Sequence, residues 1–162
     1  MQRITPVLAT MAFLTPSMAW SDWKYAHWGA TPEQVALASA GAVKVLPAAK
    51  RQKHAAPYNS MSAAEGSYVD GKLRVNLRFF FDLKSGGLNC IIFNSVSQSA
   101  GEPLKKMFVG LNGSPHVSRN NKGLGMQTFS WSTKKDEIGL TLMDGDAFAT
   151  QCVPRTQPWA GD

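Results

Sequence analysis

Charged side chains are scarce in this sequence of 162 residues: Asp, Glu, Lys and Arg make up 17% of it, whereas apolar residues make up 44%. A disordered chain has the opposite balance, so the composition excludes disorder throughout. With 14 Gly and 9 Pro, the chain also has too little of either residue to be collagen-like or of low complexity. The apolar residues suffice for one hydrophobic core but hardly for two, and we therefore expect a single domain.

Sequence signatures of catalysis are missing as well. The chain has no Gly-x-Ser-x-Gly motif, and Gly123-Leu124-Gly125 lacks the further glycines and the lysine of a phosphate-binding loop. Asp144-Gly145-Asp146 has too few neighbouring oxygen ligands for calcium and predicts a hairpin turn instead. The three histidines, His27, His54 and His116, have no metal-ligand spacing to one another or to a cysteine. We therefore predict no catalytic residue, no cofactor and no metal.

Long apolar runs are missing except near the start of the chain. The segment Ile4 to Leu14 is apolar, follows a positive charge, and precedes the small residues Ser17 and Ala19 at positions that a signal peptidase requires. A transmembrane anchor needs about 20 apolar residues, roughly twice this length. We expect residues 1–19 to be a signal peptide and residues 20–162 to be a periplasmic or secreted domain. The residue directly after the predicted cut is Trp20 and not the cysteine that lipid attachment requires, so we expect no membrane anchor after cleavage.

Only two cysteines are present, Cys90 and Cys152. An even number of cysteines in an exported chain favours one disulfide, with two separate buried thiols as the alternative. Each cysteine lies in a strand-like segment, so a bond between them would tie the last predicted strand to an earlier one. The chain-entropy treatment gives such a closed loop a stabilisation of about 4 kcal/mol.

The apolar pattern predicts an α+β fold: an antiparallel β-sheet of five to six strands with two helices packed on one face. Thr31-Pro32-Glu33-Gln34 has the signature of a capping box and begins a short helix. Apolar residues at i, i+3, i+4 and i+7 predict a second helix over residues 99–113. Residues 73–81 alternate between apolar and polar side chains, as in a strand with one buried face. Residues 48–66 and 114–123 are polar, and we expect loops there.

Further strands are expected on either side of these segments. Asp70-Gly71 is a hairpin signal that joins a short strand at residues 67–69 to the strand that follows it. Four later segments have strand-like composition and are separated by turn residues. They span residues 88–96, 126–133, 138–142 and 148–153.

Three tryptophans, Trp20, Trp23 and Trp28, lie close together at the start of the predicted mature chain. Two interpretations are open: the indole rings pack back onto the domain, or they form an exposed contact surface for a partner. We take these three residues as candidate binding residues.

The chain is basic, with a formal net charge of +6, and its clearest cluster of positive charge contains Lys50, Arg51 and Lys53. Such a cluster is typical of a solvated loop, and it is also suited to anionic lipid, glycan or an acidic protein face. Nucleic acid is disfavoured, because the chain is expected to be exported and the cluster has no interleaved aromatic residues.

Residues 27–35, with the sequence HWGATPEQV, resemble the Gly-Met-Thr-x-x-Gln-Val helix opening of the exported SmpA/OmlA-type proteins, whose α+β architecture recurs in β-lactamase-inhibitor proteins. Ala30 stands where that family has Met, and the lipidation cysteine of its lipoproteins is missing. The resemblance implies a protein-binding or envelope-assembly module without catalytic residues.

Sequence alone therefore predicts a non-enzymatic periplasmic or secreted binding module whose partner is another envelope or secreted protein. One alternative is a small exported hydrolase, for which His116 with Ser114 and Arg119 is the best candidate constellation. A pocket that holds His116 or His27 against a carboxylate would favour that alternative. The other alternative is a binder of anionic lipid or glycan through the basic cluster.

Overall fold

The computed structural model describes residues 23–54 and 59–154, so the predicted signal peptide and Trp20 lie outside the described residues. Strands dominate this part of the chain. In chain order the elements are α1 (Pro32–Ala38), β1 (Val43–Val45), the 3-10 helix η1 (Ala48–Lys50), β2 (Gln52–His54), β3 (Ser60–Asp70), β4 (Leu73–Asp82), β5 (Leu88–Ser95), α2 (Gly101–Asn112), β6 (Val117–Asn121), the 3-10 helix η2 (Lys122–Leu124), β7 (Met126–Ser132), β8 (Glu137–Met143) and β9 (Asp146–Cys152). No helix in these two stretches has the length and apolar character that a bilayer crossing demands.

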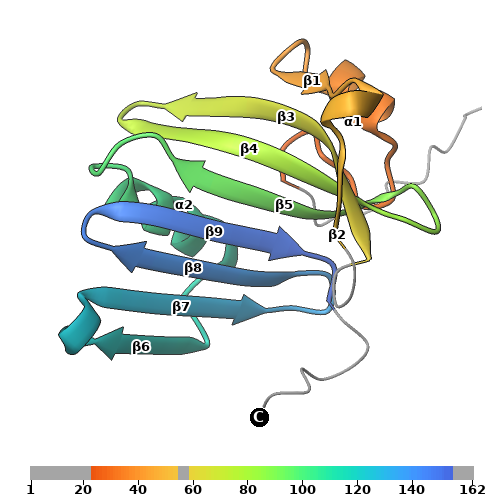
Figure 1. The fold of residues 1–162 in the computed structure, drawn as a ribbon. Helices are drawn as coiled ribbons and strands as arrows, with labels where there is room; N and C mark the ends of the chain where they lie inside the picture. Colours follow the sequence, from red (N-terminus) through yellow and green to blue (C-terminus); the bar gives the residue numbers. More distant parts are fainter. Residues whose placement is uncertain (1–22, 55–58, 155–162) are drawn as a thin grey trace, which may run out of the picture.

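All of these strands belong to one antiparallel sheet with the order β1-β3-β4-β5-β9-β8-β7-β6 (Figure 1). Strands β1 and β2 both pair with β3, at different points along its length. Strand β9 lies between β5 and β8, in the middle of the sheet. The sheet therefore consists of two meanders, β3-β4-β5 and β7-β8-β9, that meet along β5 and β9.

The predicted fold class is wrong in its number of strands. The described residues form a sheet of nine strands rather than five to six, and only α2 packs across the middle of one face, while α1 lies beside β1 and β3 (Figure 1). The additional strands come mainly from the two predicted loops: residues 48–66 contain β2 and the first half of β3, and residues 114–123 contain β6. These segments are rich in Ser, Ala and Asn, which have little preference for strands. They form strands because β3 pairs with β4 and β6 pairs with β7, and the hydrogen bonds between the strands outweigh the weak preference.

Several local predictions are confirmed. Thr31 Oγ1 accepts from the backbone N–H of Gln34 at 3.3 Å, and Gln34 Oε1 accepts from the N–H of Thr31 at 2.8 Å, which completes the capping box. Strands β4, β5, β7, β8 and β9 begin and end close to their predicted bounds. The hairpin turn between β8 and β9 uses Asp144 and Gly145, both at positive φ.

The core is a continuous aromatic layer on the face that α2 covers. Trp23 packs edge-on against Phe93 of β5 with ring centroids 5.2 Å apart, and Phe93 meets Phe108 of α2 at 5.3 Å. Phe108 in turn lies 5.9 Å from the ring of Trp131 on β7. These four side chains are all buried. The layer joins the N-terminal segment, the helix and both meanders, which fixes the sheet that carries the candidate site on its other face.

Candidate functional site

The face of the sheet opposite α2 is open along its C-terminal meander. Alternation along β5 sends Ile91 and Phe93 into the core, both 0% exposed, and Ile92 to the other face, where it is half-buried. Within the described residues, no helix packs on this second face over β5, β9, β8 and β7. Among the described residues, the side chains on this part of the face are therefore not covered by a helix.

Register aligns one row of side chains across this open face. Ser132 of β7 pairs with Glu137 of β8, which pairs with Cys152 of β9. Cys152 pairs with Cys90 of β5, and Cys90 pairs with Phe80 of β4. Directly paired residues of antiparallel strands point to the same face. Five strands thus contribute to a single row.

The neighbouring row is made mostly of small side chains. Ser130 pairs with Gly139, Gly139 with Thr150, and Thr150 with Ile92. Gly139 has no side chain and leaves a depression that lines the groove, and a Cβ at this position would be crowded by Thr150 Oγ1 at 3.3 Å. The two rows form a groove with a cavity volume of about 610 Å³, which is in the range typical of small-molecule sites.

The walls of the groove are mainly apolar. Phe80 and Ile92 lie at its β4–β5 end, Val117 at its β6 end, and Phe148 on β9. Phe148 is 44% exposed and Val117 is 45% exposed, although both side chains are large and apolar. Exposed apolar side chains gathered around a depression indicate a binding surface.

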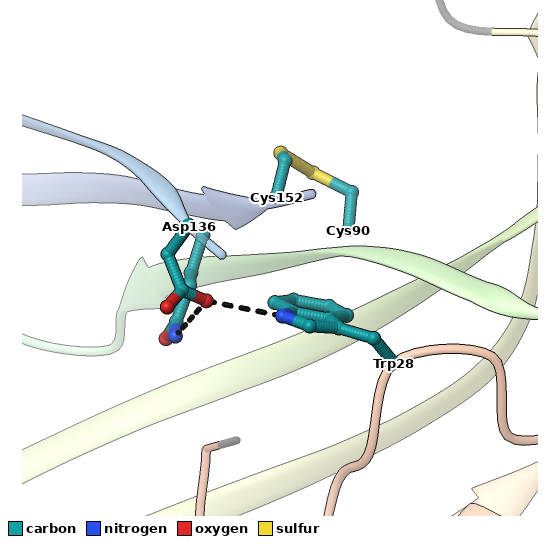
Figure 2. The surroundings of a disulfide bond; sticks show 5 residues. Trp28, Cys90, Asp136 and Cys152 are labelled. Carbon is teal, nitrogen blue, oxygen red and sulfur yellow. Dashed lines mark hydrogen bonds between the residues drawn. A yellow bond between two sulfur atoms is a disulfide. The ribbon is translucent and has the colours of Figure 1, made fainter. Parts of the chain in front are cut away.

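The predicted disulfide between Cys90 and Cys152 is present and lines the groove. A buried group of hydrogen bonds, the polar link, lies close to the disulfide (Figure 2). The Asp136 carboxylate is 1% exposed, and it accepts hydrogen bonds from Trp28 Nε1 and from Gln151 Nε2, each at 3.1 Å. The link connects the N-terminal segment to the β7–β8 turn and to β9. The disulfide and the link together hold the groove floor from both faces.

Two histidines lie at opposite ends of the groove. His116, just before β6, accepts at Nδ1 from the backbone N–H of Ser132 at 3.0 Å, so the neutral ring carries its proton on Nε2. His54, at the end of β2, packs against Phe80 with ring centroids 5.1 Å apart. Its Nε2 is buried and has no hydrogen-bond partner among the described residues. Both rings add hydrogen-bonding capacity to an apolar site.

The groove carries little formal charge. Among its described lining residues only Glu137 is an acidic or basic side chain other than histidine, and it is half-buried. No ion pair joins Glu137 to a cation within the part of the chain that the structure describes. Glu137 is therefore the one carboxylate among the described lining residues, and exposed Arg78 of β4, which pairs with Ile92, lies on the same face outside the lining.

The predicted tryptophan cluster does not form an exposed patch within the described residues. Trp23 is 1% exposed in the core, and Trp28 is half-buried with its indole N–H bonded to Asp136. These two residues therefore follow the packing interpretation. Trp20 lies outside the described residues.

The basic cluster is on the edge of the sheet and does not line the groove. Lys50 in η1 and Lys53 in β2 are exposed, whereas Arg51 is half-buried and its Nε donates to the carbonyl oxygen of Leu46 at 2.9 Å. Arg51 thus fixes the loop that precedes β2, and the two lysines remain available to solvent.

The candidate hydrolase residues are not brought together as a triad. His116 lines the groove with Glu137, but no hydrogen bond or ion pair between these two is found in the described structure. Ser114 and Arg119 are exposed and are not part of the lining. The described residues also contain no group of acidic, histidine and cysteine side chains that would hold a metal.

Sequence reasoning missed the groove itself. In the sequence, Cys90 and Ile92 alternate with Ile91 and Phe93, so both faces of β5 have apolar side chains. The depression at Gly139 depends on which residues of β7 and β9 lie opposite it, and this register is not readable from the chain alone. Comparisons with known protein families, curated proteins and solved structures find no match for this chain.

Proposed function

We propose that this chain is a non-enzymatic binding protein of the periplasm or extracellular space, and that the open-face groove is its binding site for a small apolar molecule. The observation that carries this proposal is the apolar groove of about 610 Å³ on the face that no described helix covers. Ligand sites of this size are mostly apolar with a few polar groups that orient the ligand, and the groove has this character. The disulfide and the export features of residues 1–19 support a location outside the cytoplasm.

A small molecule fits this site better than the protein partner that the sequence suggests. A stable protein interface buries about 800 Å² on each partner, whereas the apolar side chains of the open face cluster locally around one depression. The protein partner remains a prediction. Anionic lipid or glycan at Lys50 and Lys53 is a separate proposal, because these exposed lysines lie outside the groove.

The test measures binding of N-phenyl-1-naphthylamine, a neutral, apolar dye, to the mature chain. The fluorescence of the dye reports how much of it is bound. We expect saturable binding to the wild type. Gly139→Leu places a side chain in the depression and should weaken binding about tenfold, because the dye loses apolar contact area there.

Thr128→Leu is the matched control, since Thr128 lies on the same face in the neighbouring strand β7, outside the groove lining, and does not pair with a lining residue. It should bind the dye like the wild type. Phe148→Ala gives a second, independent variant that removes a wall of the groove without adding volume. If neither Gly139→Leu nor Phe148→Ala weakens binding while both variants melt as the wild type does, the groove is not the binding site.

A further inference from the structure

The charge of the groove is opposite to that of the chain around it. The protein carries 17 Lys and Arg against 11 Asp and Glu, yet the formal charge among the described lining residues is the carboxylate of Glu137. A half-buried carboxylate is less screened by solvent than one on the open surface, and it attracts a cation more strongly. A ligand at the Glu137 end of the groove therefore meets a negative charge, whereas Arg78, which pairs with Ile92 on the same face but lies outside the lining, is at the β4 end.

Glu137 places a carboxylate at the β8 end of the groove, whereas the opposite end has Phe80 with the His54 ring packed against it. The neighbours of Glu137 in the sheet are Ser132, which offers a hydroxyl, and Cys152. From Glu137 on β8 the row continues over the disulfide to Phe80 on β4. These are three strand spacings, or about 14 Å at the usual separation of paired strands. An elongated apolar body fits this length with its head at Glu137.

Resting on the proposed function, we infer that the natural ligand is a cationic amphiphile: an apolar chain or ring system that ends in a protonated amine. The amine lies against the Glu137 carboxylate, and the apolar body crosses the disulfide toward Ile92 and Phe80. An anionic head group at this position would be repelled by the carboxylate.

The experiment compares three amphiphiles that differ only in their head group: dodecylamine, dodecanol and dodecanoate, each below the concentration at which it forms micelles. Each one displaces N-phenyl-1-naphthylamine from the mature protein at neutral pH and low salt. We expect dodecylamine to displace the dye at about a fivefold lower concentration than dodecanol, and dodecanoate to be the weakest. Added salt should reduce the preference for the amine.

Glu137→Gln should remove the preference for the amine, measured within this variant as the ratio of the dodecylamine and dodecanol concentrations that displace half of the dye. Glu65→Gln is the matched control, because Glu65 is an exposed carboxylate on β3 that lies outside the groove lining, and it should keep the preference. Equal displacement by all three amphiphiles, or a preference for dodecanoate, would overturn the cationic ligand while the groove remains a binding site. Failure of the neutral dye to bind would instead overturn the proposed function.

Discussion

The two faces of the sheet are built from the same strands but differ in how densely their side chains pack. The covered face is filled by large side chains that touch one another, such as Phe93, Phe108 and Trp131. Successive residues of each strand point alternately to the covered face and to the open face. Around the groove on the open face, small side chains and one glycine separate a few apolar residues. A face that only needed to meet water would be polar throughout. Apolar side chains around a depression are the feature of the open face on which the proposed binding site rests.

The largest expected effect breaks the covered face. Phe93→Ala removes a ring that contacts both Trp23 and Phe108, and it should lower the free energy of unfolding by about 3–5 kcal/mol. Denaturant unfolding measures the loss. Phe148→Ala is the comparison on the open face, and it should cost far less stability because Phe148 is 44% exposed. Equal losses would mean that the two faces do not differ in their role.

An intermediate effect concerns the polar link beneath the groove. Trp28→Phe keeps an aromatic ring but removes the indole donor to buried Asp136, and it should lower the free energy of unfolding by about 1–3 kcal/mol. Thermal unfolding monitored by circular dichroism would show it. Because the link lies on the covered side, affinity for the neutral dye should stay near the wild-type value. A variant as stable as the wild type would show that the hydrogen bond contributes nothing.

The smallest effect lies at the end of β4, in the turn that leads to β5. Asp82 accepts from the backbone N–H of Ser85 at 2.7 Å, from Ser85 Oγ at 3.0 Å and from the N–H of Lys84 at 3.0 Å. The backbone and side-chain hydrogen bonds from Ser85 hold the pKa of Asp82 below its ordinary value. With a folded pKa below the unfolded one, the stabilisation is complete above the unfolded pKa and is lost as the pH falls through the folded one.

We therefore expect Asp82→Asn to unfold at a slightly lower denaturant concentration than the wild type at pH 7. The difference should disappear as the pH falls to about 2, below the ordinary range of aspartate. Denaturant midpoints at several pH values measure it. A difference that stays constant down to that pH would show that the charge of Asp82 is not involved.

The sequence predicts the elements whose signals are local. The capping box at Thr31 and the alternation of β4 depend on residues a few positions apart, and the structure contains both. Strand β3 was missed over its first half because Ser60 to Ala64 is rich in small residues. Its strand conformation comes from pairing with β4, whose residues lie some 20 positions later in the chain.

Of the candidate site, only the disulfide could be predicted from the sequence. The even number of cysteines predicted the disulfide, which the structure contains. The groove around it requires Gly139, Thr150 and Ile92 to lie in one row across three strands. A shift of one residue in any of these pairings would turn the side chains of that strand to the other face, and nothing local in the sequence fixes the pairing.

The central place of β9 affects the order in which the fold can assemble. Strand β9 follows every other described strand in the chain, yet it closes the middle of the sheet between β5 and β8. As the chain emerges from a ribosome or a translocation channel, the meander β3-β4-β5 has an unpaired edge at β5 until residues 146–152 arrive. Such contacts between distant segments form slowly, and unpaired edges aggregate. The two meanders therefore reach their final arrangement only when nearly the whole described chain is free to fold.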